Sequence, residues 1–328
     1  RPHTEMRQFE NSPATVFVPA EQGALREALQ RAKKNTTLVL SKGVYEEAEV
    51  LVIDVEGLCI VAFDEIPLDG RAPTTIVGNS NLLTGESPLF HIKAKDFCLR
   101  NVCLELSSQS PGDCCLLISD KSEASIENCR ISAGSKFIGI EIGQYAKPTI
   151  KGCDVVRNKI GIYMNDHASP ALSHNTIHEC GTGVCVTDHA SGCCSDSTIH
   201  NCHEAGIVAT GNSETCFRNN EVRDAGVCGV LFAHESCARV EGCRIHGRHT
   251  NGVQAGDAAD PFVTGSSVAG ALGSGVMLHG RARGFFSLNT VQGSCLAGVG
   301  VRDSAAPVFV ENQIVGGRTS GLVLLGAA

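Results

Sequence analysis

One short phrase recurs along the chain between residues 139 and 325, and its glycines are 22, 22 and then repeatedly 23 residues apart. The phrase reads Gly139-Ile-Glu-Ile, Gly161-Ile-Tyr-Met, Gly183-Val-Cys-Val, Gly206-Ile-Val-Ala, Gly229-Val-Leu-Phe, Gly252-Val-Gln-Ala, Gly275-Val-Met-Leu, Gly298-Val-Gly-Val and Gly321-Leu-Val-Leu. Its second and fourth residues are almost all apolar and the third varies, which is the period-two pattern of a strand with one buried face. A fixed period of this length indicates a repeat architecture.

Each repeat contains two further strand signals. An apolar column follows the glycine phrase by about ten residues, and a third column lies five residues later and is always β-branched, which favours strand over helix. The second column is Ile126, Ile150, Leu172, Cys194, Phe217, Val240, Val263, Phe286 and Phe309, and the third is Ile131, Val155, Ile177, Ile199, Val222, Ile245, Val268, Val291 and Ile314.

An Asn or Gly recurs between the second and third columns, and we expect these residues to take the left-handed backbone of a sharp corner. They are Asn128, Gly152, Asn175, Asn220, Gly242, Gly265, Asn289 and Asn312. Three strands per repeat with no room for a helix predict an all-β, single-stranded parallel β-helix of three strands and 22–23 residues per coil. Crossover handedness favours the right-handed form.

The regular repeats occupy one part of a single continuous domain. Residues 1–45 are expected to form an N-terminal segment and cap, with a strand at Thr15–Val18 and an amphipathic capping helix over about residues 21–34. Residues 46–115 are expected to form irregular first coils with loops at Pro67–Thr74, Asn79–Ser87 and Ser107–Asp113, and residues 116–328 to form the regular coils.

Composition limits the partners. The chain has 328 residues, 42% hydrophobic content and a net charge of -8, typical of a globular protein with an ample core. No apolar run approaches the length of a membrane span, and the acidity argues against nucleic acid, so neither partner is expected. The 17 cysteines, an odd number spread over most coils, are interpreted as reduced apolar filler in an intracellular, cytoplasmic or cytoskeleton-associated protein.

The repeats resemble a known group. Gly161-Ile-Tyr-Met-Asn-Asp-His-Ala-Ser-Pro, followed by Asn175-Thr-Ile-His, looks like the parallel β-helix repeats of the pectin-lyase-like superfamily. Its intracellular eukaryotic branch, with the β-helix F-box adaptors and the Shc-binding/Nessun dorma-like proteins, is the closer match, and Ala24–Tyr45 resembles the superfamily's entry segment. The resemblance implies the fold and suggests adaptor or cytoskeletal roles. No family catalytic residue maps onto a position here.

The strongest candidates for catalysis are Asp166, His167, Asp188 and His189, which occupy the same place in adjacent coils. Stacking would bring the two carboxylates to about 5 Å, near the separation used by retaining glycosidases. The alternative is a turn ladder, because Asp120, Asp257 and Asp303 occupy the same column.

The variable position of the glycine phrase should point outward, and it holds one carboxylate, Glu141, among uncharged residues. An apolar outward strip is typical of a contact surface, so a protein partner is expected at Tyr163, Cys185, Val208, Leu231 and Met277. The alternative for this strip is coverage by a loop of the chain itself.

A second outward column holds His178, His200, Arg223 and His246 beside Cys180 and Cys202. Because those cysteines fall in an inward corner column, this column is interpreted as a polar, partly cationic stripe for an acidic partner and not as a metal site. No cofactor is expected.

These observations favour a non-catalytic interaction scaffold or adaptor within a larger chain or assembly. The alternative is a polysaccharide-active enzyme, a lyase, hydrolase or epimerase on uronate-type glycans. The chain begins at Arg1 and stops after the first strand of a new coil, so we expect further chain or a partner at the C-terminal end.

Overall fold

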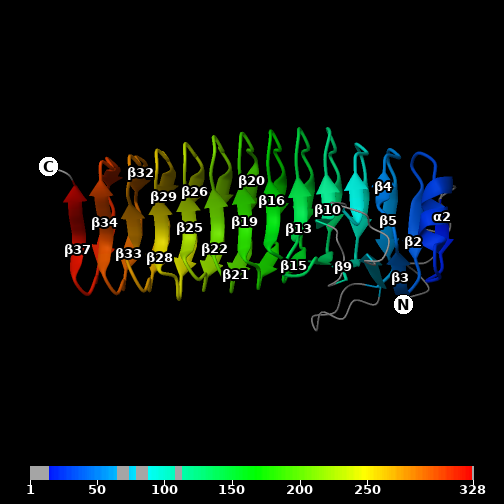
Figure 1. Ribbon diagram of the computed structural model, residues 1–328, viewed down its shortest axis with the longest axis horizontal. Helices are drawn as coiled ribbons and strands as arrows, with labels where there is room; N and C mark the ends of the chain where they lie inside the picture. Colours follow the sequence, from blue (N-terminus) through cyan, green and yellow to red (C-terminus); the bar gives the residue numbers. More distant parts are fainter. Residues whose placement is uncertain (1–14, 65–73, 79–87, 108–112, 327–328) are drawn as a thin grey trace.

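The computed structural model describes residues 15–64, 74–78, 88–107 and 113–326. Within these residues the chain winds into a solenoid with three parallel sheets, A, B and C, of 13, 12 and 12 strands (Figure 1). Neighbours in each sheet come from successive coils, so the β-helix predicted from the repeat is confirmed. The three predicted loops of the first coils lie almost entirely outside the described residues.

Sheet A holds the second apolar column and also the N-terminal strand. Its strands are β1 (Thr15–Val18), β2 (Thr37–Leu40), β5 (Cys59–Ala62), β8 (Cys98–Arg100), β11 (Ser125–Glu127), β14 (Thr149–Lys151), β17 (Ala171–Ser173), β20 (Cys193–Ser195), β23 (Cys216–Arg218), β26 (Arg239–Glu241), β29 (Phe262–Thr264), β32 (Phe285–Ser287) and β35 (Val308–Val310).

Sheet B holds the β-branched column. Its strands are β3 (Gly43–Glu47), β6 (Thr74–Gly78), β9 (Cys103–Leu106), β12 (Arg130–Ser132), β15 (Asp154–Val156), β18 (Thr176–His178), β21 (Thr198–His200), β24 (Glu221–Arg223), β27 (Arg244–His246), β30 (Ser267–Ala269), β33 (Thr290–Gln292) and β36 (Gln313–Val315).

Sheet C holds the glycine phrase. Its strands are β4 (Leu51–Ile53), β7 (Phe90–Ile92), β10 (Cys114–Ile118), β13 (Ile138–Ile142), β16 (Ile160–Met164), β19 (Thr182–Val186), β22 (Ala205–Ala209), β25 (Cys228–Phe232), β28 (Asn251–Ala255), β31 (Val276–Leu278), β34 (Ala297–Asp303) and β37 (Ser320–Gly326).

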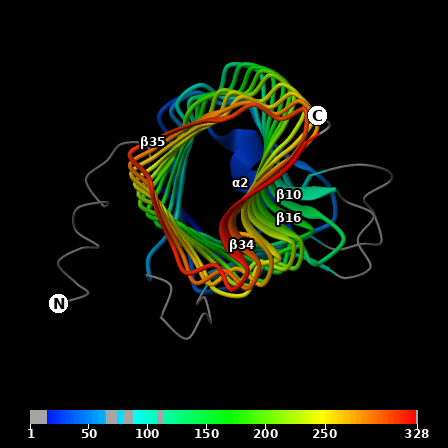
Figure 2. The ribbon, with the colours of Figure 1, turned by 90° about the vertical axis from the view of Figure 1, so that its left-hand side faces the viewer.

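The core runs along the axis of the solenoid because each sheet points a column of side chains inward. Ile140, Ile150 and Val155, one from each sheet in the same stretch of chain, are all 0% exposed. The end-on view shows the three sheets forming one ring of coils (Figure 2). The buried side chains of the core fill its interior. Like residues therefore stack on like, as the repeat requires.

The recurring glycine is explained by crowding. A Cβ atom at Gly229 would lie 2.4 Å from Ile245 Cγ2 of sheet B and 2.6 Å from the carbonyl oxygen of Gly252 in the next coil. Real Cβ contacts essentially never fall under 3.0 Å. The same pair of obstacles surrounds Gly183, Gly206, Gly252, Gly275 and Gly298. Each glycine thus makes room for the β-branched column of sheet B.

The expectation for the corner residues is only partly right. Asn128 and Gly152 have left-handed backbones, with φ of 51° and 64°. Asn220, by contrast, is buried: its Oδ1 accepts a hydrogen bond from the backbone N–H of Ser197 at 3.0 Å, and its Nδ2 donates to the carbonyl of Cys194 at 2.8 Å. In the coils with this arrangement the preceding residue takes the left-handed backbone instead: His174, Asn219, Leu288 or Glu311, before Asn175, Asn220, Asn289 and Asn312.

The N-terminal helix α2 (Ala24–Arg31) is shorter than the predicted 21–34. It begins after Gly23, whose φ is 78°, and ends where Ala32 turns extended. Leu25 is buried, and Ala28 and Leu29 pack against the core. The helix lies across the N-terminal end of the solenoid, where Figure 2 shows it behind the coils. At the other end, β37 pairs with β34, and the prediction that something covers this end stays a prediction.

Candidate active site on the outer face of sheet C

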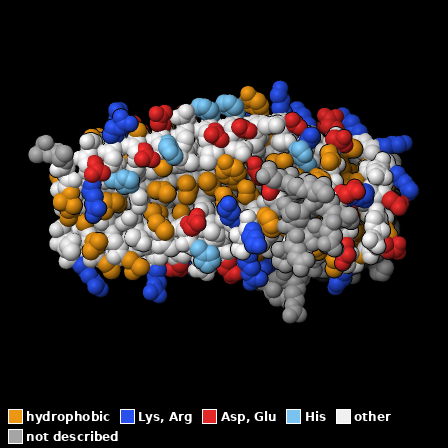
Figure 3. Space-filling model, in the orientation of Figure 1, with side chains coloured by type: hydrophobic (Ala, Val, Ile, Leu, Met, Phe, Trp, Pro, Cys, Tyr) orange, Lys and Arg blue, Asp and Glu red, His pale blue; other side chains and the backbone are white. Residues whose placement is uncertain are grey.

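The variable position of the glycine phrase points out from sheet C, as predicted. The strand register stacks these residues one coil apart in the order Val52, His91, Leu117, Glu141, Tyr163, Cys185, Val208, Leu231, Gln254, Met277, Gly300 and Val323. Figure 1 shows this sheet from outside, and in Figure 3 hydrophobic side chains gather along the middle of the same face. The predicted partner strip, Tyr163 to Met277, is half-buried by its neighbours along the stack.

Glu141 is the carboxylate of this column, and its surroundings favour the protonated form. Burial raises the pKa of Glu141, and the nearby charges of Asp113 and Asp166 raise it further. The Nδ2 of Asn165, one coil on, donates a hydrogen bond to Glu141 Oε1 at 3.1 Å and partly opposes that shift. A carboxyl with a raised pKa on an outer face is suited to act as a general acid.

Tyr163 is the register partner of Glu141 on the next strand. Its hydroxyl lies 3.3 Å from Thr187 Oγ1, which in turn donates to Asp188 Oδ2 at 3.0 Å. Glu141 therefore has polar neighbours in the next coil, and Tyr163 connects that coil to the polar groups of the coil after it. The sequence predicted Glu141 as an outward carboxylate but did not single it out, because the signal is Asn165 in the following coil, which hydrogen-bonds it.

The four residues proposed for catalysis lie together at the corner between sheets C and A. Asp166 and Asp188 have left-handed backbones, and each accepts a hydrogen bond from the coil before it: Asp166 Oδ2 from the N–H of Gln144 at 3.0 Å, and Asp188 Oδ2 from the N–H of Asp166 at 3.3 Å. Asp257 and Asp303 make the same bond. The turn ladder is therefore present, and a catalytic role for these residues stays a prediction.

His167 and His189 are exposed and stack face to face, with ring centroids 5.2 Å apart, and Tyr145 stacks on His167 at 5.1 Å. At the end of this stack, Tyr145 helps to line a hollow of about 500 Å³ together with Lys121, Glu123 and Lys147. The stack thus forms an aromatic edge beside the outer face of sheet C.

The predicted cationic stripe lies on the outside of sheet B, and carboxylates already pair with much of it. His178 Nε2 lies 2.9 Å from Asp154 Oδ1, and His246 Nε2 lies 2.8 Å from Glu221 Oε1. His178 and His200 stack at 5.0 Å. Cys180 and Cys202 are buried in the inward corner column, as expected. This pairing weakens the attraction that an acidic partner would find, and that partner stays a prediction.

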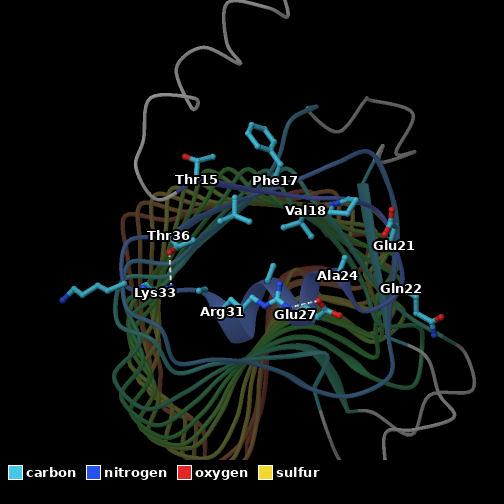
Figure 4. A pocket seen from close by; sticks show the side chains of 15 residues that line it. Thr15, Phe17, Val18, Glu21, Gln22, Ala24, Glu27, Arg31, Lys33 and Thr36 are labelled. Atoms are coloured by element: carbon cyan, nitrogen blue, oxygen red, sulfur yellow. Dashed lines mark hydrogen bonds and ion pairs between the residues drawn. The ribbon is translucent and has the colours of Figure 1, made fainter.

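Other features of the described residues lie elsewhere. A hollow of about 690 Å³ opens between β1 and α2 at the N-terminal end, where Glu27 pairs with Arg31 and the N–H of Lys33 donates to Thr36 Oγ1 (Figure 4). Over the same described ranges, no three His, Cys, Asp or Glu side chains come together as a metal site would require. All 17 cysteines are free thiols. No described helix is long and apolar enough to cross a membrane.

Three parallel sheets wound around one core define a β-helix protein with a long outer sheet face. The family model for the right handed β-helix region matches residues 104–213 and 205–328, more than half of the chain. The protein therefore belongs to this family of right-handed β-helices. The match does not distinguish the intracellular eukaryotic branch, which stays a prediction. By sequence, no curated protein matches the chain.

Several solved structures share the fold over most of the chain. The A-module of the mannuronan C-5 epimerase AlgE4 from Azotobacter vinelandii has a TM-score of 0.69 and 14% identity, covering 93% of this chain and 95% of that one. The catalytic domain of a GH87 α-1,3-glucanase has a TM-score of 0.65 and 12% identity, covering 97% and 67%. The periplasmic alginate epimerase AlgG has a TM-score of 0.59 and 11% identity, covering 95% and 84%.

These neighbours correct the expected function. We expected a non-catalytic scaffold, but the neighbours named above are enzymes that act on polysaccharides. The alternative prediction, a polysaccharide-active enzyme, is the better supported. The low charge of the outward column favoured a scaffold, but a reaction centre needs only a few well-placed groups, so low charge does not exclude one. At such low identity the likeness shows the fold, and the activity is a matter for proposal.

Proposed function

We propose that this chain is a polysaccharide-active enzyme whose reaction centre lies around Glu141 on the outer face of sheet C. The observation that carries the proposal is a half-buried carboxyl with a raised pKa, held by Asn165 on a long and otherwise uncharged column. An extended sugar chain fits a stack of coils because both repeat along one axis. The likeness to polysaccharide-active enzymes supports the same reaction class. An intracellular location, supported by the odd number of cysteines, is part of the proposal.

In this proposal Glu141 transfers the proton and Asn165 fixes its orientation. The Asn165 Nδ2 donates to one carboxyl oxygen, so the other can face the substrate. Tyr163, beside it on β16, offers a ring edge and a hydroxyl to the neighbouring sugar. Since a general acid must be protonated, activity should fall as pH rises through the raised pKa of Glu141.

The test is turnover of a polysaccharide panel by the wild-type chain and by Glu141→Gln. Loss of a general acid typically lowers the rate by about 10²–10⁴-fold, so the variant should lose kcat with little change in KM. Glu204→Gln is the matched control: Glu204 is exposed at the corner that leads into sheet C and accepts a hydrogen bond from Thr182 Oγ1 at 3.2 Å. Equal activity of wild type and Glu141→Gln would refute Glu141 as the reaction centre.

A further inference from the structure

The central column of the outer face of sheet C has no charged side chain for a long distance beyond Glu141. From β16 to β34 this column runs through Tyr163, Cys185, Val208, Leu231, Gln254, Met277 and Gly300. Beside it, Cys228 Sγ and Asn251 Nδ2 both lie within hydrogen-bond reach of Gln254 Oε1, at 3.3 and 3.0 Å, and His279 Nε2 lies 3.2 Å from Gln254 Nε2. His91, on the other side of Glu141, has a pKa lowered by burial, which keeps it neutral near pH 7.

This face suits a neutral sugar chain and opposes an acidic one. A polyuronate carries a carboxylate on every sugar, so several would lie above half-buried apolar side chains, where loss of hydration is unfavourable. Those carboxylates would also approach Glu141, Asp113 and Asp166 on a chain whose net charge is -8. A neutral sugar instead places its C–H face on Val208 and Leu231 and loses little.

Resting on the function proposed above, we infer that the substrate is a neutral polysaccharide and that the reaction is hydrolysis. Elimination and C-5 epimerisation both require the acidic C–H beside a uronate carboxylate, which a neutral sugar lacks. Hydrolysis needs only water and two carboxyl groups. The second group is Asp166, which directly follows Asn165, the residue whose Nδ2 donates to Glu141 Oε1 at 3.1 Å, and its charge contributes to the raised pKa of Glu141.

Hydrolysis by this pair of carboxyl groups conserves every proton. Glu141 gives its proton to the glycosidic oxygen while the bond from that oxygen to C1 breaks. Asp166 takes a proton from a water molecule, whose oxygen forms the new bond to C1. The proton returns from Asp166 to Glu141 through solvent, which restores both groups. Asp166 can serve the turn ladder through Oδ2 and face the water with Oδ1.

A pair of matched variants separates this role from the ladder. Asp166→Asn and Asp257→Asn both keep a side-chain oxygen that can accept the ladder hydrogen bond, from Gln144 and His234 respectively. A purely structural role predicts equal, small effects. Our inference predicts that Asp166→Asn lowers kcat at least 100-fold while its melting temperature and that of Asp257→Asn stay together, and that Asp257→Asn keeps most of its activity.

The experiment incubates the chain with neutral glucans, mannans and xylans and, separately, with alginate and polygalacturonate. New reducing ends, absorbance of unsaturated uronates and C-5 inversion by NMR are measured. We expect new reducing ends from a neutral polymer, lost in Glu141→Gln and Asp166→Asn. Turnover of polyuronates alone would overturn the neutral substrate and leave the proposed function standing. Turnover of neither class would overturn both.

Discussion

The glycine that opens each phrase offers the sharpest test of how the coils pack. In Gly229→Ala the new Cβ would lie 2.4 Å from Ile245 Cγ2, whereas carbon atoms pack best at about 3.5–4.0 Å, so the two must separate by roughly 1 Å. Rotation of Ile245 cannot relieve the second contact, which is with the backbone carbonyl of Gly252 at 2.6 Å. Overpacking typically destabilises by about 1–3 kcal/mol, and the backbone contact places this variant near 3 kcal/mol.

The control is the same phrase in the last described coil. A Cβ at Gly321 would meet only Ile314 Cγ2, at 3.9 Å, which is ordinary contact. Thermal unfolding followed by circular dichroism should show Gly229→Ala melting roughly 6 °C lower, at about 2 °C per kcal/mol for a long chain, and Gly321→Ala nearly unchanged. Equal melting temperatures for the two variants would refute the crowding argument. Adding Ile245→Ala should relieve part of the Cβ clash, so the double variant should lose less stability than the two single variants lose together.

Two further predictions concern buried polar groups. Asn220→Ala leaves the N–H of Ser197 and the carbonyl of Cys194 without their buried partner, so we expect the free energy of unfolding to fall by about 2–5 kcal/mol, with a matching fall in the denaturation midpoint. A change no larger than that of exposed Asn219→Ala would contradict this role of Asn220. His249 is fully buried, and burial lowers its pKa from 6.5. As pH falls below about 6.5 the unfolded chain therefore binds the proton first, and stability should drop between pH 7 and 5. In His249→Asn, whose Oδ1 can accept the N–H of Ala225 in place of Nδ1, that drop should be smaller; parallel melting curves against pH would refute it.

The outer face of sheet C shows how a site can arise on a repeat. Each coil supplies one outward residue to the stacked column, so a single substitution in one repeat changes the chemistry of one position along that column. Glu141 is such a substitution in a column of uncharged side chains. Asn165 and Tyr163, from the following coil, give it the hydrogen bond and the neighbour that a lone surface glutamate would lack.

The sequence alone was sufficient for the β-helix, because a solenoid turns periodicity into contact. Residues such as Ile140 and Ile162, one period apart, must stack, so the apolar columns of the sequence identify the core and the outward positions. The start of α2 and the corner role of Asn220 were harder to predict from the sequence. The helix start depends on a single glycine, Gly23, and the role of Asn220 depends on hydrogen bonds to the neighbouring coil, and neither follows from the period.

The burial and the pairing of the polar groups, by contrast, follow from the folded structure alone. Asp166 and Glu141 look alike in the sequence, yet one is exposed and serves a turn, while the other is half-buried with a raised pKa. Likewise, the sequence predicts His178 as part of an open polar stripe, whereas in the fold its Nε2 lies 2.9 Å from Asp154 Oδ1. Periodicity fixes which side chains are neighbours, but burial and charge depend on every neighbour at once, and those are brought together only by the folded chain.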